Sequence, residues 1–344
     1  MHKQFIDVVR GKRVFIATHW DADGVTSGAI LYHLIKKYCD VIGTNSKGVV
    51  FKIDDDDILV DYDFVIVSDI MPGNLNRNNV IYIDHHPNDN KYFMKIHDEL
   101  YQSCSLLIWD KIIFPMIKER EICDKEDIRY FIFLTLLGYF GDGGSEEDIP
   151  LELFILAKEM IPDLMEYECS WEREYLKITK YVSLLNIGKR NFWNGNMPLE
   201  LLKSTTNISE IVNNNHPISQ KLNEIKKDLS KLYSKEVDIL KLNNIDVAVI
   251  ESEKNIQGVL CARHMNQKPI IVLNRWKKYV IASMRVPEEV NFNAGEFLRN
   301  IGSELNVLEG GGHEKAAGIT INDCDFDSFI TTLKKKDREL KQQF

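Results

Sequence analysis

Three short apolar runs in the first quarter of the chain end within three residues of acidic side chains. The side chains that follow are Asp21 and Asp23 after residues 14–18, Asp69 after residues 64–68, and Asp84, His85 and His86 after residues 80–83. Short β-branched runs of this kind predict strands that are buried on both faces of a parallel sheet. Ligands of open α/β sheets bind beyond the carboxyl ends of the strands. The sequence therefore predicts that carboxylates and imidazoles gather on one rim of one sheet.

Crowded carboxylates repel one another, and each raises the pKa of its neighbours. Divalent cations usually resolve this repulsion. Oxygen ligands with a minority of imidazole nitrogen suit manganese, iron or zinc, and magnesium less well. We therefore predict a divalent metal site on this rim.

The size and charge of the chain limit the kind of protein it encodes. Its 344 residues favour two domains over one. The 43 basic and 52 acidic residues give a net charge of −9, which argues against a wide nucleic-acid surface that ignores sequence, because such surfaces are basic. A local basic groove or a small phosphorylated ligand remains compatible with this charge.

The cysteines and the apolar segments indicate where the protein works. Its six cysteines include no Cys-x-x-Cys pair, which indicates reduced thiols rather than disulfides or a structural zinc site. The N-terminus lacks a signal-peptide pattern, and the longest apolar stretch, 130–140, is too short to cross a bilayer. We expect a cytoplasmic protein with no membrane contact.

Residues 1–190 alternate between strand-like and helix-like segments. Strands are expected at 12–18, 48–53, 64–69 and 80–84, and helices at 24–38, 103–118, 126–140 and through 150–188. The crossovers are long enough for βαβ units, so the sheet should be mainly parallel with helices on both faces. Residues 191–236 are expected to form a helical linker that ends in a Lys-rich helix at 218–236.

Residues 237–344 predict a smaller α+β domain. Its expected elements are strands at 245–250, 269–273, 278–284 and 317–321, a helix at 293–301, a glycine-rich turn at 310–312 and a charged terminal helix from 333. The expected architecture is an α/β N-terminal domain joined by the helical linker to this domain. The active site is expected in the cleft between the two.

Four acidic positions are candidate metal ligands. Asp21 and Asp23 lie two apart on a turn and can point at one centre, and Gly24 permits a tight entry into the helix. An ordinary helix cap is the alternative role for that turn. Asp69 is a natural bridging ligand. Asp142, between glycines after an apolar helix, is either a surface acid at a helix end or the last ligand.

The sequence Asp84-His85-His86 is the most specific feature. Two adjacent histidines at a strand end cannot both face the same way, so one can bind a metal while the other faces substrate. A ligating imidazole usually hydrogen-bonds a carboxylate through its other nitrogen, and Asp84 is available for that contact.

A glycine-rich segment in the second domain is a candidate anion site. Residues 310–312 are three glycines followed by His313, and successive backbone N–H groups there can form a concave anion site. Arg285 and Arg263 are candidate phosphate clamps, because guanidinium offers a fork of donors.

Together these motifs resemble the DHH phosphoesterases, and the C-terminal part resembles the DHH-associated domain. The resemblance covers both domains in the right order. Many members have a ligating histidine four residues before the first aspartate of the turn. In this chain Ala17 occupies that position, and His19 lies two residues before Asp21. This spacing resembles that of RecJ-like members more than that of nanoRNase-like ones. A role for His19 as a metal ligand stays open.

The resemblance implies a site with two metal ions per chain, usually manganese, with magnesium as a substitute. It implies that Asp21 and Asp69 hold one ion, that Asp23, Asp69, His85 and Asp142 hold the other, and that His86 faces the scissile phosphate with Asp84 beside it. It further implies that Gly311, Gly312, His313 and Arg285, with Arg263 as a further candidate, hold the terminal phosphate or nucleotide of the substrate.

The expected activity is hydrolysis of single-stranded RNA or DNA, or of short oligonucleotides, from an end. One alternative is a phosphodiesterase of cyclic dinucleotides, their linear products or a nucleoside bisphosphate. Another is an inactive scaffold of a replication complex. A homodimer and a replication or repair partner are both left open, as are the sugar preference and the polarity.

Overall fold

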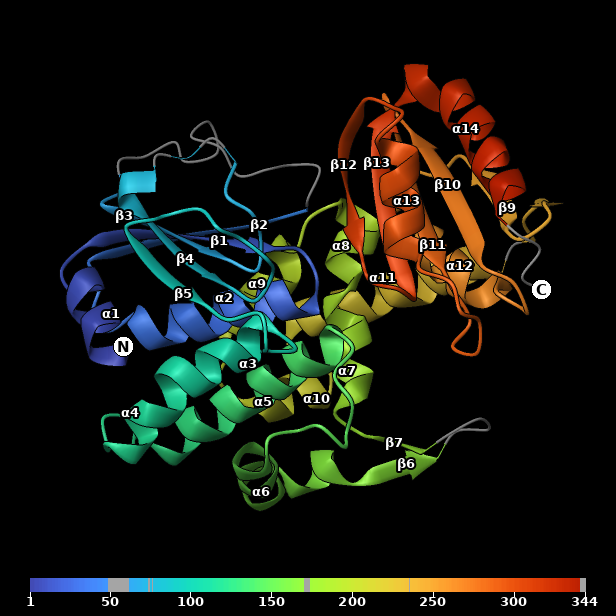
Figure 1. The fold of residues 1–344 in the computed structure, drawn as a ribbon. Coiled ribbons are helices and arrows are strands. Elements are labelled where there is room, and N and C mark those ends of the chain that lie inside the picture. The colour runs from blue at the N-terminus through green and yellow to red at the C-terminus, as the bar shows by residue number, and fades with distance from the viewer. Residues whose placement is uncertain (49–61, 74, 76, 170–173, 235, 341–344) are drawn as a thin grey trace. The chain divides into compact units, whose positions relative to one another are not determined.

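The computed structural model describes residues 1–48, 62–73, 75, 77–169, 174–234 and 236–340 (Figure 1). The chain divides into two compact units, Met1–Lys226 and Lys227–Phe344. The division falls within helix α11 (Pro217–Tyr233), so most of the predicted linker belongs to the first unit. The boundaries expected at residues 190 and 236 stay predictions.

The first unit contains a five-stranded sheet. Its strands lie in the order β2 (Val41–Lys47), β1 (Arg13–His19), β3 (Phe64–Ser68), β4 (Val80–Asp84) and β5 (Met94–His97). Every neighbouring pair is parallel, which confirms the predicted parallel sheet. Because β1, β3 and β4 are consecutive, their carboxyl ends meet at one place on the rim.

Helices make up most of the rest of this unit. They are α1 (His2–Val9), α2 (Ala22–Ile35), α3 (Cys104–Ile108), the π-helical segment Trp109–Ile113, α4 (Phe114–Lys118), α5 (Lys125–Gly141), α6 (Leu151–Met160), α7 (Thr179–Leu185), α8 (Ile187–Phe192), α9 (Asn196–Ser204) and α10 (Ile208–Val212). Helix α2 is buried along nearly its whole length because it packs between β1 and the helices α5, α3 and α9. This central position brings the residues at its N-terminus to the rim.

The opposite face of the sheet has its own apolar cluster. Phe15, Val65 and Tyr82 point into it, and Ile70 and Leu75 from the segment after β3 complete it. Tyr62 and Tyr92, which lie in connecting segments, pack against this cluster.

The second unit contains a six-stranded sheet. The order is β12 (Val307–Gly312), β13 (Ala316–Asn322), β11 (Tyr279–Arg285), β10 (Ile270–Trp276), β9 (Asp246–Ile250) and β8 (Ile239–Lys241). Its helices are α12 (Gln257–His264), α13 (Ala294–Gly302) and α14 (Phe326–Glu339). Phe297 of α13 and Phe329 of α14 share one core with Met284 of β11. The predicted second, sheet-containing domain is confirmed.

The strand predicted at 48–53 falls almost wholly on residues outside the described part of the chain. The sequence pattern did not indicate β2 and β5, since both are edge strands with few buried side chains and thus no apolar run. The helices predicted through 150–188 are interrupted by a hairpin, β6 (Tyr167–Cys169) and β7 (Glu174–Leu176).

Among the described residues, every helix is too short or too polar to cross a membrane.

Candidate metal centre

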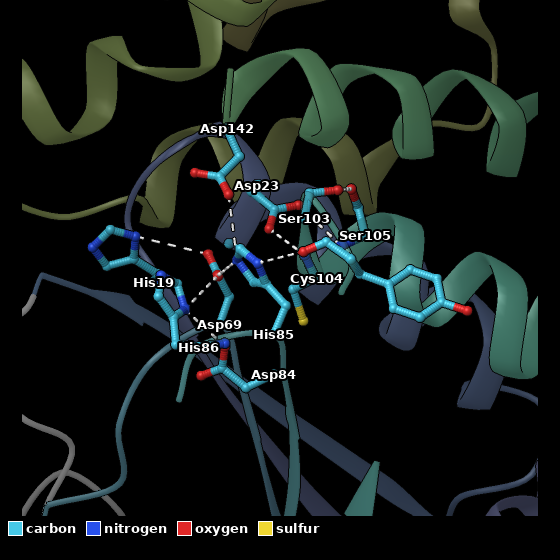
Figure 2. Close-up of polar contacts among 12 residues, drawn as sticks. His19, Asp23, Asp69, Asp84, His85, His86, Ser103, Cys104, Ser105 and Asp142 are labelled. Carbon is cyan, nitrogen blue, oxygen red and sulfur yellow. Dashed lines mark hydrogen bonds and ion pairs between the residues drawn. The ribbon is translucent and has the colours of Figure 1, made fainter. Parts of the chain in front are cut away.

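The rim brings together carboxylates and imidazoles from four elements of the first unit. Asp21 and Asp23 come from the start of α2, Asp69 follows β3, and Asp142 ends α5. His85 and His86 follow β4 directly. Figure 2 shows His85 pointing toward Asp69 and Asp142. The structure therefore gathers the predicted ligands, although they are spread over some 120 residues of sequence.

The turn from β1 into α2 combines two roles that the sequence left as alternatives. Asp21 caps α2, because its side chain accepts a hydrogen bond from the Gly24 backbone N–H at 3.2 Å. Its other oxygen lies 2.8 Å from His19 Nδ1. A β-carbon on Gly24 would lie 2.4 Å from the His19 carbonyl oxygen, so only glycine allows this close approach.

Asp23 is held by the N-terminus of α3. Its two carboxylate oxygens accept the backbone N–H groups of Cys104 at 2.6 Å and Ser105 at 3.0 Å. Gly138 of α5 makes room, because a β-carbon there would lie 2.6 Å from an Asp23 oxygen. The sequence did not predict this pair of hydrogen bonds to Asp23. The one local signal for it is Ser103, which caps the N-terminus of α3. The contacts fix the carboxylate and leave lone pairs on both oxygens.

Asp69 occupies the centre of the cluster. Its backbone has φ +61°, a left-handed conformation that aspartate and asparagine tolerate better than most residues. One carboxylate oxygen lies 3.5 Å from His85 Nε2 and the other 3.8 Å from His19 Nδ1. The side chain is almost fully buried. This position between two sets of donors suits a bridging ligand.

The two adjacent histidines have different surroundings. His85 Nδ1 lies 3.1 Å from the Tyr101 carbonyl oxygen and donates to it, which leaves Nε2 as an acceptor facing Asp69 and Asp142. His86 Nδ1 instead lies 2.8 Å from an Asp84 oxygen, and its side chain is 47% exposed. Asp84 therefore orients His86 and not His85, the histidine that was expected to bind metal, because the tight turn after β4 directs only the second ring back to Asp84.

The Asp84 carboxylate is itself fixed. It accepts hydrogen bonds from the Tyr82 hydroxyl at 2.8 Å and from the His86 backbone N–H at 2.9 Å. The hydrogen bond to Asp84 raises the pKa of His86 to about 9, although burial opposes the shift. Burial lowers the pKa of His85, so that its ring is neutral, as a metal ligand must be.

Burial and mutual repulsion perturb the acids. Burial, then the charges of Asp23 and Asp21, raise the pKa of Asp142 to about 8. The same causes place the pKa of Asp69 well above its ordinary value. Burial also raises the pKa of Asp23. Asp21 differs from these three acids, because burial is outweighed there by the charges of His19 and Lys189, and the pKa falls.

The donor atoms form groups of the size that a metal ion needs. His19, Asp21 and Asp69 make one group, and Asp23, His85 and Asp142 make another, with the ligand atoms of each group within 4.8 Å of one another. The buried His85 Nε2 has no hydrogen-bond partner among the described residues. An orphaned imidazole nitrogen facing two carboxylates fits a divalent cation better than any arrangement of these side chains alone.

Metal binding to this rim should release protons. Burial raises the pKa of Asp142 to about 8, so this carboxyl is mostly protonated at pH 7, whereas a metal ligand must be deprotonated. We expect Mn²⁺ to displace roughly one proton at pH 7 and fewer at pH 9. Calorimetric titration in buffers of different ionisation enthalpy measures this number. Asp142→Asn should release fewer protons, and identical heats in all buffers would contradict the prediction.

Lys189 of α8 is a member of the cluster that the sequence did not indicate. Its Nζ lies 3.6 Å from Asp21. No local pattern marks it, since α8 reaches the rim only through packing of the helices. Its positive charge offsets part of the negative charge on that side of the rim.

The predicted substrate residues all lie in the second unit, and one expectation about them is wrong. Gly311 and Gly312 belong to strand β12, paired with Gly318 and Ala317 of β13, and do not form a glycine-rich turn. The turn comes after exposed His313, whose N–H donates to the Ala316 carbonyl at 2.8 Å. Because β12 is the edge strand of this sheet, pairing with β13 occupies only one of its two sides.

The two arginines lie in different settings. Arg285 is the last residue of β11 and is half-buried, with its Nη1 donating to the Met284 carbonyl oxygen at 2.8 Å. Its register partner is Ala316, so it lies at the same end of the sheet as the turn after β12. Arg263 is exposed in the last turn of α12.

The fold and the rim define an α/β protein built around a candidate site for divalent metals. The "DHH family, N-terminal domain" model matches residues 13–135, and the "DHHA1 domain" model matches residues 244–338. The chain thus carries a DHH family N-terminal domain followed by a DHHA1 domain, as the motifs suggested. No match to a curated protein was found.

Several solved structures share this fold. Exonuclease RecJ bound to manganese is 17% identical with a TM-score of 0.62, covering 99% of this chain and 94% of its own. RecJ from Thermus thermophilus in complex with Mn²⁺ is 19% identical with a TM-score of 0.66, covering 99% of this chain and 54% of its own. The DHH domain of a member of the s1p family of ribosomal proteins is 17% identical with a TM-score of 0.65, covering 99% and 89%. These likenesses establish a RecJ-like fold.

Proposed function

We propose that this protein is a phosphodiesterase that depends on two divalent metal ions, manganese by preference, and hydrolyses single-stranded nucleic acid or short oligonucleotides from an end. The observation that carries the proposal is the pair of donor groups beside Asp69, one of which contains the orphaned Nε2 of His85. The RecJ-like fold supports it, because the similar structures include an exonuclease bound to manganese.

Each ion has a set of ligands from this chain. Asp21, Asp69 and His19 would hold one, and Asp23, Asp69, His85 and Asp142 would hold the other. Two such ions lower the pKa of an attacking water and neutralise charge that develops on the phosphate. The oxygen-rich donor set with imidazole nitrogens favours manganese over magnesium.

His86 is the proposed acid. Asp84 binds its Nδ1 and keeps the ring protonated, and the half-exposed ring presents its other edge to substrate. A histidine in this state can give a proton to the leaving oxygen. Tyr82 and Asp84 act as positioning residues, since both work through the orientation and charge of His86.

The second unit is proposed to hold the end of the substrate. His313 and Arg285 offer cationic or hydrogen-bonding groups, and the exposed glycines Gly311 and Gly312 let a ligand approach the edge strand closely. Arg263 is a further candidate for a phosphate contact. The net charge of −9 favours short or single-stranded substrates over a long duplex.

A substrate panel tests this function. End-labelled RNA and DNA of graded length, with cyclic dinucleotides alongside, would be incubated in Mn²⁺ and in Mg²⁺. We expect stepwise shortening of the single strands from one end in Mn²⁺. Faster cleavage of a cyclic dinucleotide would replace the proposed substrate, and an absence of both manganese binding and hydrolysis would favour the replication scaffold.

A further inference from the structure

A second group of metal-binding side chains lies on the first unit and shares no residue with the acidic rim. It consists of His2 at the start of α1, and Glu119 and Glu121 in the turn after α4. Helix α1 leads into the amino end of β1, whereas the rim follows the carboxyl ends of the strands. The group is therefore not an extension of the candidate metal centre.

The spacing of the donor atoms suits one metal ion. His2 Nε2 lies 3.6 Å from an oxygen of Glu119 and 3.8 Å from an oxygen of Glu121. All three atoms lie within 4.8 Å of one another. Zinc binds imidazole nitrogen and carboxylate oxygen at about 2.0–2.2 Å, so ligands of one ion lie roughly 3–4 Å apart. A small closing of the two flexible glutamates would complete the set.

The histidine supplies an independent sign of a missing partner. Its side chain is only 9% exposed. Its Nε2 is buried and has no hydrogen-bond partner in the described part of the chain. Both glutamates lie beyond hydrogen-bond distance of it. Buried polar atoms are nearly always satisfied, so a nitrogen left open toward two carboxylates points to a cation between them.

The backbone presents both glutamates to the histidine. The N–H groups of Arg120 and Glu121 donate to the Ile117 and Met116 carbonyls at 3.0 and 2.8 Å, which closes the end of α4. Arg120 has φ +61°, a position at which glycine is usual. The turn thus holds a conformation that is unfavourable for arginine and places acids on both sides of it.

Lys3 is the competing cation in this group. Its Nζ lies 2.5 Å from Glu119, and this hydrogen bond lowers the pKa of that carboxyl. The lysine keeps Glu119 ionised, and its exposed side chain can turn into solvent when a more highly charged ion arrives. Glu121 has no lysine or arginine ion pair among the described residues.

We propose that His2, Glu119 and Glu121 bind one divalent transition-metal ion, zinc by preference, that fastens α1 to the turn after α4. Zinc is favoured because a site of imidazole and carboxylate holds it more tightly than manganese. Water would complete the coordination, since the two glutamates are partly exposed. The role is structural, because none of the residues proposed to bind substrate belongs to these segments.

Zinc counting on the full-length chain tests the proposal. Protein stripped with chelator would be dialysed against Zn²⁺, and the retained ions per chain would be measured for wild type, His2→Gln and Glu121→Gln. Glu126→Gln is the matched control, since Glu126 is an exposed acid at the start of α5 outside the group. The melting temperature with and without Zn²⁺ provides a second readout.

We expect wild type and Glu126→Gln to retain one more zinc ion per chain than His2→Gln and Glu121→Gln. The affinity for that ion should fall by more than roughly tenfold, because even changes around a ligand typically cost about 10- to 100-fold. Equal counts and equal zinc-induced melting shifts in wild type and Glu121→Gln would overturn the site. Glu121→Gln decides the matter even if His2→Gln fails to fold, since its side chain is one-third exposed. Asp69→Asn should keep this ion, which separates the proposal from the proposed function.

Discussion

Replacing Asp69 with asparagine should abolish hydrolysis while the protein stays folded. The residue lies between His19 and His85 and belongs to both proposed ligand sets, so its loss removes one charged ligand from each ion. Turnover should fall by more than roughly 100-fold, beyond what outer-shell changes around a metal typically cost. Asparagine is the right replacement because it keeps the shape of the side chain and tolerates φ +61°.

The measurement is steady-state hydrolysis of a labelled single strand in Mn²⁺, with the melting temperature of the metal-free protein as the control for folding. Stability should hold or rise, because a buried carboxylate crowded by Asp23 and Asp84 is replaced by a neutral amide. Turnover near that of wild type would remove the proposal of two ions sharing this ligand.

Replacing Asp84 with asparagine should move the alkaline limb of the activity profile to lower pH. The hydrogen bond that His86 donates to Asp84 raises the pKa of His86 to about 9, so the proposed acid is protonated below that pH and loses its proton above it. Without the carboxylate, the pKa falls toward the ordinary value of about 6.5. At pH 8.5 the protonated fraction would then drop from about three quarters to about one hundredth.

The full pH profile of turnover for both proteins measures this effect. Bound cations lower the pKa of His86 in both wild type and Asp84→Asn. The quantity to compare is therefore the pH shift of the alkaline limb between the two proteins, which we expect to exceed about one pH unit. Loss of activity at pH 6 should be much smaller than at pH 8.5. A uniform loss at every pH would show that Asp84 acts on structure alone. His86→Gln is the companion variant and should lose the alkaline limb altogether.

The apolar runs and the acidic residues that follow them predicted which side chains lie on the rim of the candidate site. Parallel strands leave their carboxyl ends on one edge, so residues directly after 14–18, 64–68 and 80–83 had to meet if these runs were neighbours in one sheet. The structure puts β1, β3 and β4 side by side. Asp142 was harder to assign, because a helix end is directed by packing rather than by strand order.

The contacts that set the chemistry could not be predicted in the same way. That Asp84 binds His86 rather than His85 depends on how the turn after β4 rotates two adjacent rings. The clamp on Asp23 depends on where α3 begins relative to α2, some 80 residues earlier in the chain. Both are decided by side-chain directions and helix packing, for which a linear pattern carries no signal.

The glycines at 310–312 show that strand pairing can override the conformation that the local sequence favours. Local conformational freedom suggested a turn, but pairing with β13 made them part of an edge strand, because hydrogen bonds along a ladder outweigh the flexibility of glycine.

The amino-acid sequence by itself determined the class of fold, the family and which side chains gather at the rim, since periodic burial and strand order are local properties repeated along the chain. Only the tertiary structure decided which nitrogen of each histidine is left for a metal, which acids carry raised pKa values, and that His2 meets two glutamates more than a hundred residues away. These features depend on distances of a few ångströms between segments that are far apart in sequence, and on the exclusion of water by packing. A local sequence pattern predicts neither of these two properties.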